Sequence, residues 1–169
     1  MLALAGCGGG TSHTDTSRTA TVAAVSPLPT QPPLPYRWLV PTQGPPPSIA
    51  RENLAHGTTA WRLPGPRELL GGEAHGAVEG YAARQAVLPG ETQRIYVNAP
   101  GAREVAVSVY RMGWYHGRGG RLVLQSRLLP AVRQPGCTHR ATTGLTECRW
   151  HPTLSFVIPP SLPSGVYIV

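Results

Sequence analysis

The chain has 169 residues, of which 20 are glycine and 19 are proline, and its formal net charge is +7 at pH 7. All 15 of its Lys and Arg residues are arginine, and they are scattered singly rather than grouped in basic runs. No apolar segment approaches the ~18 residues that a membrane-spanning helix requires. Composition therefore argues against nucleic acid as a partner and against an integral membrane protein.

The first seven residues, MLALAGC, end in a motif that suggests export. Leu4-Ala5-Gly6-Cys7 resembles the lipobox of bacterial lipoproteins, in which a signal peptidase cuts before the cysteine and the thiol then carries a diacylglycerol. The segment has no positively charged start, so either the true start lies upstream of Met1 or the match is accidental. If the match is real, residues 1–7 are the remnant of a signal peptide and Cys7 is the lipidation site. The protein would then lie outside the cytoplasm, in the cell envelope, held on the membrane surface by its lipid.

Residues 8–47 are rich in Gly, Thr, Ser and Pro and contain few apolar clusters. Such a segment buries too little surface to offset the entropy of ordering it, so we expect a disordered, partly polyproline linker. Within it, residues 36–40 (YRWLV) are the exception. They form either a short strand that docks on the following domain or an apolar patch inside the linker.

Residues 48–169 carry the strand signals of the chain. Apolar and polar residues alternate over residues 94–98, 104–110 and 121–125, and turn-forming Gly and Pro residues separate these runs. Further strands are expected at residues 78–88, 153–158 and 165–169. This pattern predicts an all-β fold, an immunoglobulin- or fibronectin-like antiparallel β-sandwich preceded by the linker. Because the sequence stops inside the apolar run 165–169, we expect a domain truncated at its C-terminal end, with a further domain or a subunit as partner.

Several short motifs resemble one protein family. They are EN at 52–53, EGY at 79–81, YRMGWY at 110–115 and PSGVY at 163–167. Together they resemble the amino-terminal β-sandwich of proteins similar to the large (beta) subunit of N,N-dimethylformamidase, and YRMGWY is the most specific of them. In that family, amide hydrolysis is associated with an iron site held by tyrosines and a glutamate in a later domain. The resemblance therefore implies no catalytic residue, metal ligand or cofactor within this chain.

Cys137 and Cys148 flank a polar loop, and an exported context favours a disulfide between them. A zinc site that includes His139 and His151 is the competing interpretation, but the spacing has no CxxC or HxxxH element. Two free, buried cysteines are the third.

Trp114 and Tyr115 lie beside glycines at the end of an expected strand. They could form a binding surface that stacks on sugars or on a partner protein. Aromatic residues that close the end of a sandwich core are the more common case. Nearby, Arg111 is expected to pair with Glu79 or Glu104 across the strands.

The sequence offers little for catalysis. Asp15 is the one aspartate, and the six histidines are dispersed without ligand spacing. No GxSxG, GxGxxG or P-loop pattern occurs. We therefore expect a non-catalytic accessory domain. The alternatives are a scaffold fragment of an iron-dependent amidohydrolase that acts on small amides, and a glycan-binding module.

Overall fold

The computed structural model of this protein describes residues 33–62 and 78–169. The strands are β1 (Tyr36–Trp38), β2 (Glu79–Ala82), β3 (Thr92–Asn98), β4 (Glu104–Val105), β5 (Ser108–Met112), β6 (Gly120–Ser126), β7 (Leu129–Pro130), β8 (Thr138–Arg140), β9 (Leu145–Glu147), β10 (Leu154–Val157) and β11 (Tyr167–Ile168). The helical elements of this part are α1 (Ile49–Glu52) and a 3-10 turn (Tyr115–Gly117). No helix among these residues has the length and apolar character needed to cross a membrane.

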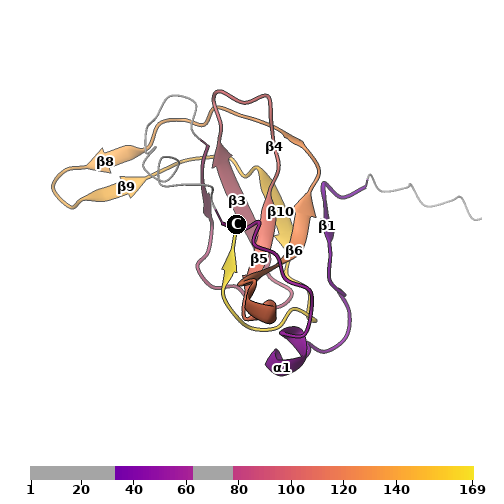
Figure 1. The fold of residues 1–169 in the computed structure, drawn as a ribbon. Coiled ribbons are helices and arrows are strands. Elements are labelled where there is room, and N and C mark those ends of the chain that lie inside the picture. Colours follow the sequence, from indigo (N-terminus) through magenta and orange to yellow (C-terminus); the bar gives the residue numbers. More distant parts are fainter. Residues whose placement is uncertain (1–32, 63–77) are drawn as a thin grey trace, which may run out of the picture. The chain divides into compact units, whose positions relative to one another are not determined.

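The main strands form two antiparallel sheets (Figure 1), ordered β1-β6-β5-β11 and β10-β3-β2. Two short ladders, β4-β7 and β8-β9, complete the pairing. The predicted all-β, antiparallel fold is therefore confirmed.

The core lies where the inner faces of the two sheets meet. Ile95 and Val97 alternate with more exposed residues along β3, as the period of two predicts. Across the core, Val109 and Leu124 are almost fully buried. The ring of Phe156 on β10 meets Tyr36 and Trp38 edge-on, with centroids 6.0 and 5.7 Å away. Strands from both sheets thus share one apolar cluster.

Strand β1 belongs to this sandwich. Tyr36 pairs with Ser126, and Trp38 pairs with Leu124, on the outer side of β6. Of the two interpretations of residues 36–40, docking on the sandwich is correct. The sandwich therefore includes part of residues 8–47, the segment whose composition predicts a linker.

Side-chain hydrogen bonds interrupt two of the expected strands. The run 78–88 forms a strand only over β2, because the side chain of Gln93 then bonds the backbone of Arg84 at both its N–H and its C=O. The run 104–110 is divided between β4, which pairs with β7, and β5, which pairs with β6. At the division, Ser126 Oγ accepts a hydrogen bond from Val107 N–H at 2.8 Å. In each case a side chain bonds a backbone group that would otherwise pair with the backbone of a neighbouring strand.

The hairpin β8–β9 extends away from the sandwich (Figure 1), and all six of its strand residues are exposed. Cys137 and Cys148, which flank it, are joined in the expected disulfide. The imidazole of His139 contacts Thr146 Oγ1 through Nδ1.

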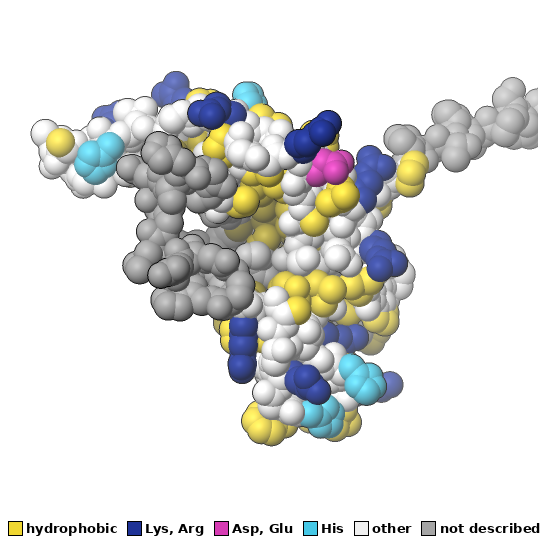
Figure 2. Space-filling model, turned by 45° about the horizontal axis from the view of Figure 1, so that its top comes forward, with side chains coloured by type: hydrophobic (Ala, Val, Ile, Leu, Met, Phe, Trp, Pro, Cys, Tyr) yellow, Lys and Arg dark blue, Asp and Glu magenta, His cyan; other side chains and the backbone are white. Residues whose placement is uncertain are grey.

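Charge is distributed unevenly over the surface. Arginine side chains lie all over the face shown in Figure 2, whereas acidic side chains are visible there at one place only.

Candidate functional site

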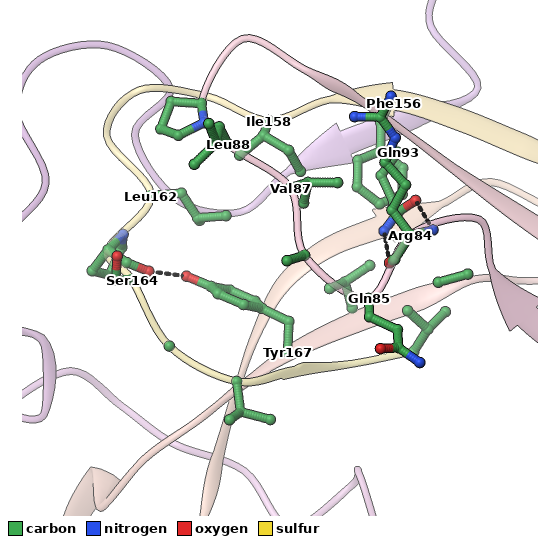
Figure 3. Close-up of a pocket in the computed structure, with 18 of the residues that line it drawn as sticks. Arg84, Gln85, Val87, Leu88, Gln93, Phe156, Ile158, Leu162, Ser164 and Tyr167 are labelled. Carbon is green, nitrogen blue, oxygen red and sulfur yellow. Dashed lines mark hydrogen bonds between the residues drawn. The ribbon is translucent and has the colours of Figure 1, made fainter.

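A cavity of about 500 Å³ opens between the loop that follows β2 and the segment that contains β11 (Figure 3). Its walls are mainly apolar and include Val87, Leu88, Phe156, Ile158 and Leu162. The volume is in the range of small-molecule sites.

Two polar side chains that line the cavity, Gln93 and Tyr167, are bonded to the backbone (Figure 3). Gln93 Nε2 donates to the Arg84 carbonyl at 2.7 Å, and its Oε1 accepts from the N–H groups of Arg84 and Arg94. The hydroxyl of Tyr167 donates to the Pro163 carbonyl. The described residues of the lining include no carboxylate, histidine or cysteine. The cavity can therefore hold an apolar group by shape, but it has no acid–base pair.

Behind one side of this cavity lies Arg111, whose side chain is buried at 3% exposure. Its Nη2 donates to the Ser164 carbonyl at 3.0 Å, and its guanidinium packs on Gly165, where a Cβ would meet Nη2 at 3.1 Å. The expected pairing of Arg111 with Glu79 or Glu104 is wrong. The side chain points into the fold, where it holds the segment that leads into β11.

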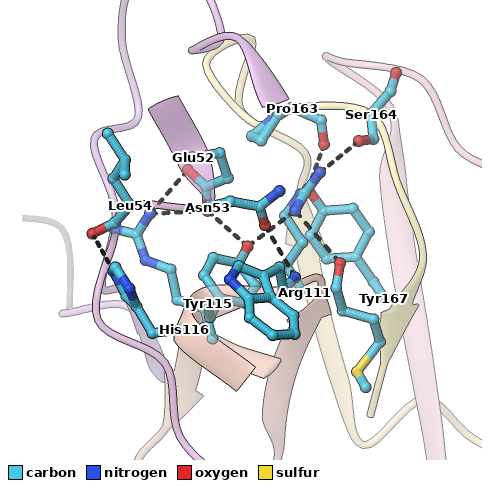
Figure 4. A network of polar contacts seen from close by, with 12 residues as sticks. Glu52, Asn53, Leu54, Arg111, Tyr115, His116, Pro163, Ser164 and Tyr167 are labelled. Carbon is cyan, nitrogen blue, oxygen red and sulfur yellow. Dashed lines mark hydrogen bonds and ion pairs between the residues drawn. The ribbon is translucent and has the colours of Figure 1, made fainter. Parts of the chain in front are cut away.

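Arg111 is one end of a buried polar network (Figure 4). Its Nη1 donates to Tyr115 Oη at 2.9 Å, and Tyr115 Oη donates to Glu52 Oε1 at 2.8 Å. Glu52 lies at the end of α1. Arg121 Nη1 donates to both of its carboxylate oxygens, at 2.8 Å and 2.9 Å. One carboxylate thus lies between two arginines, with a phenol as the link to the more deeply buried of them.

Tyr115 lies in a turn with unusual backbone. The turn joins β5 to β6, and φ is positive at three successive residues: 41° at Tyr115, 55° at His116 and 79° at Gly117. Glycine adopts such values freely, but residues with a Cβ do so at a cost of about 1–2 kcal/mol each. Burial of the Tyr115 side chain and its two hydrogen bonds compensate for this strain. The network therefore sets the shape of the turn.

Burial changes the ionisation of the groups in this network. It raises the pKa of Tyr115, and it raises the pKa of Tyr167 to about 12. For Arg111, burial lowers the pKa, but the hydrogen bond with Tyr115 and the surrounding groups raise it on balance. At neutral pH both phenols are therefore protonated donors beside a charged guanidinium.

Tyrosines and a glutamate are the residue types that the family resemblance associates with iron, so the fit of a metal to this network can be examined. Glu52 is already neutralised by Arg121, and the Tyr115 hydroxyl carries its proton toward that carboxylate. The guanidinium of Arg111 would repel a cation bound at Tyr115. Within the described ranges, no group of three or more His, Cys, Asp or Glu is placed to hold a metal ion. The network does not fit a metal.

The two aromatic residues of the expected binding surface are on opposite sides of the turn. Trp114 is 68% exposed, whereas Tyr115 is completely buried. Tyr115 therefore closes the core, and a stacking surface made of both rings does not exist. Cys7, the expected lipidation site, lies outside the described residues.

A comparison with protein families gives one match. Residues 106–169 match the family described as N,N-dimethylformamidase beta subunit-like, C-terminal. The resemblance drawn from the sequence is confirmed over this segment, which begins just before β5 and includes the Tyr115 turn and β11. The matched description names a C-terminal part of such proteins, whereas the motifs of the sequence resemble their amino-terminal sandwich. No curated protein and no solved structure gives a match.

Glu52 and Arg121 were not singled out from the sequence as partners. They are 69 residues apart, and nothing in their spacing indicates contact. The motifs EN and YRMGWY, noted for the family resemblance, contain Glu52, Arg111 and Tyr115. What these motifs share in the structure is the buried network.

Proposed function

We propose that this chain provides a non-catalytic β-sandwich to an exported, lipid-anchored bacterial protein that resembles the beta subunit of N,N-dimethylformamidase. In this role the sandwich packs beside, or presents, a larger catalytic or binding domain. The family match supports the relationship to such proteins. The disulfide supports a location outside the cytoplasm, because disulfides persist in oxidising compartments.

The observation that supports the non-catalytic role is the set of hydrogen bonds that Glu52 accepts. It is the one buried carboxylate among the described residues. A general acid or base must be free to exchange a proton with a substrate. Both oxygens of Glu52 are engaged, one by Tyr115 and both by Arg121. Its contacts hold α1 against the hairpin β5–β6, which is a structural task.

Hydrolysis of N,N-dimethylformamide by the purified chain tests this role. We expect the chain to release dimethylamine no faster than a buffer blank, with or without added ferrous iron. Release above the blank that is lost in Glu52→Gln, while a folded control such as Glu147→Gln retains it, would overturn the proposal.

The anchor is tested separately, by metabolic labelling with a fatty-acid analogue in a bacterial host that carries the chain behind a working signal segment. We expect label in the parent and none in Cys7→Ser. Equal labelling of both would remove the lipid anchor without affecting the role of the sandwich.

A second candidate follows from the name of the matched family. The chain would then be a scaffold portion of an iron-dependent hydrolase of small amides, with chemistry in another domain. Purification of the native protein through a tag on the exposed β8–β9 hairpin distinguishes the two. Co-purification of iron and amide hydrolysis favours the scaffold role, and their absence favours the accessory role.

A further inference from the structure

We propose that one end of the sandwich docks on an anionic lipid surface. This docking end consists of Ile49, Arg51, Leu54, Trp114, His116 and Arg118, which come from α1, the loop that follows it and the turn between β5 and β6. The inference rests on the proposed function for its setting at a bacterial envelope, but its test requires no lipid anchor.

The docking end exposes large apolar side chains. Ile49 is 51% exposed, Leu54 is 71% exposed and Trp114 is 68% exposed. Two hydrogen bonds tie the loop to the turn: Asn53 Oδ1 accepts from Trp114 N–H at 3.0 Å, and His116 Nε2 lies 3.3 Å from the Leu54 carbonyl. Figure 4 shows Leu54 and His116 side by side next to the buried network. The loop that carries Leu54 therefore lies beside the turn that carries Trp114.

The charge of this end is entirely basic. Arg51 and Arg118 are exposed, and neither takes part in an ion pair among the described residues. In residues 45–62 and 111–121 the one carboxylate is Glu52, which is buried and bound to Arg121. At the lower end of Figure 2, hydrophobic, arginine and histidine side chains lie together with no acidic side chain in view. Such a surface is complementary to a negatively charged partner.

The turn also holds Trp114 outward. The positive φ values at Tyr115 and His116 are strained, and the buried contacts of Tyr115 maintain them. Strain of this kind is kept where the surrounding structure fixes an unusual backbone. Here it places one aromatic ring in the core and its neighbour in solvent.

Among anionic partners, a lipid surface fits best. Tryptophan is favoured at the boundary between headgroups and acyl chains, because its ring is apolar and its N–H is polar. Aliphatic side chains such as Ile49 and Leu54 insert into that boundary, but they do not stack on bases or sugars. Arginines beside them attract anionic headgroups. The combination matches a docking surface for phospholipid.

Vesicle co-sedimentation of the full chain carrying Cys7→Ser, so that no acyl group contributes, tests the inference. The probes are vesicles of phosphatidylcholine alone and of phosphatidylcholine with phosphatidylglycerol. We expect binding to the anionic vesicles, weaker at high salt and weaker still to the neutral ones. Trp114→Ala should lower partitioning about tenfold. Arg118→Gln should lower it about fivefold.

Matched controls come from elsewhere on the surface. Leu145→Ala removes an exposed side chain of β9, and Arg133→Gln removes an exposed cation, both outside the docking end. We expect both to bind as the parent does, and circular dichroism confirms that each variant is folded. The inference is overturned if the anionic vesicles are not bound, if the control variants lose as much binding as Trp114→Ala, or if a single-stranded oligonucleotide displaces the chain from the vesicles. None of these outcomes bears on labelling of Cys7.

Discussion

Glu52 shows how a single carboxylate can hold separate parts of a small domain together. It is 4% exposed, and it joins Arg121 of β6 directly and Arg111 of β5 through the hydroxyl of Tyr115. Two guanidinium groups and one carboxylate leave this cluster with one excess positive charge. Buried charges of this kind are tolerated only while each has its partner, since an unpaired charge retains its full cost of desolvation.

Glu52→Gln is therefore expected to destabilise the chain strongly. The substitution keeps the volume but leaves two arginines without a counter-charge, and we expect a loss of about 3 kcal/mol in the free energy of unfolding. Urea denaturation followed by circular dichroism measures it.

The matched control is Glu147→Gln, in an ion pair whose side chains are 64% and 53% exposed. There we expect a change of about 0–1 kcal/mol. Equal losses in the two variants would mean that the buried network contributes no more than a surface pair.

At the scale of the elements, the hairpin β8–β9 and the two sheets differ in what supports them. The hairpin buries none of its strand residues. At its base, Trp150 donates to the Pro135 carbonyl and packs on Tyr81, whose hydroxyl donates to the Cys148 carbonyl. The disulfide thus constrains a segment that contributes little to the core.

Removal of the disulfide should consequently have a local effect. In the chain-entropy model, closing a loop of this length stabilises a fold by about 3 kcal/mol. In the Cys137→Ser/Cys148→Ser variant, however, the hairpin can gain much of the same freedom without unfolding of the sandwich. We expect a change in global stability below about 1 kcal/mol, together with faster amide exchange at residues 138–147.

The measurement is hydrogen exchange combined with thermal unfolding. A large fall in the midpoint, with no local increase in exchange, would show that the hairpin and the core unfold as one unit.

The sequence predicted those elements that have a strong period of two. Ile95 and Val97 identify β3, because their alternation coincides with burial. Strand β1 has only three residues, too few for a period, so the sequence pattern does not decide its place. The break between β4 and β5 could not be seen, because the alternation runs through it and the change of partner depends on Ser126. For the site, the sequence pointed to Trp114, Tyr115 and Arg111, but with other partners for Arg111. The opposite exposure of Trp114 and Tyr115 follows from positive φ values that their residue types do not suggest.

For the molecule as a whole, the buried phenols make stability depend on alkaline pH. The pKa of Tyr167 rises to about 12 from an ordinary value of 10.0, and that of Tyr115 also rises. The folded state therefore holds these protons more tightly than the unfolded state does. Their contribution to stability is fully present below pH 10 and is lost as the pH rises from 10 through 12.

Tyr167→Phe should flatten this dependence. The variant loses the hydroxyl that donates to the Pro163 carbonyl, so its stability at pH 8 is expected to be slightly lower than that of the parent. Between pH 10 and 12, however, its free energy of unfolding should fall less steeply.

Urea titrations at a series of pH values give the slope of the free energy of unfolding against pH for the parent and for Tyr167→Phe. Tyr110→Phe is the matched control. Identical slopes for Tyr167→Phe and the parent would assign the alkaline loss to other groups.

The bond from Arg111 to the Ser164 carbonyl has a mechanical consequence. Residues 163–167 form one side of the cavity and Arg111 lies behind them, so an occupant that pushed this side outward would press it against the guanidinium. The displacement would then pass through the guanidinium to Tyr115 and Glu52, and so to the backbone at Trp114. An increase in the volume of the cavity and a movement of the exposed Trp114 ring are thereby linked through Arg111.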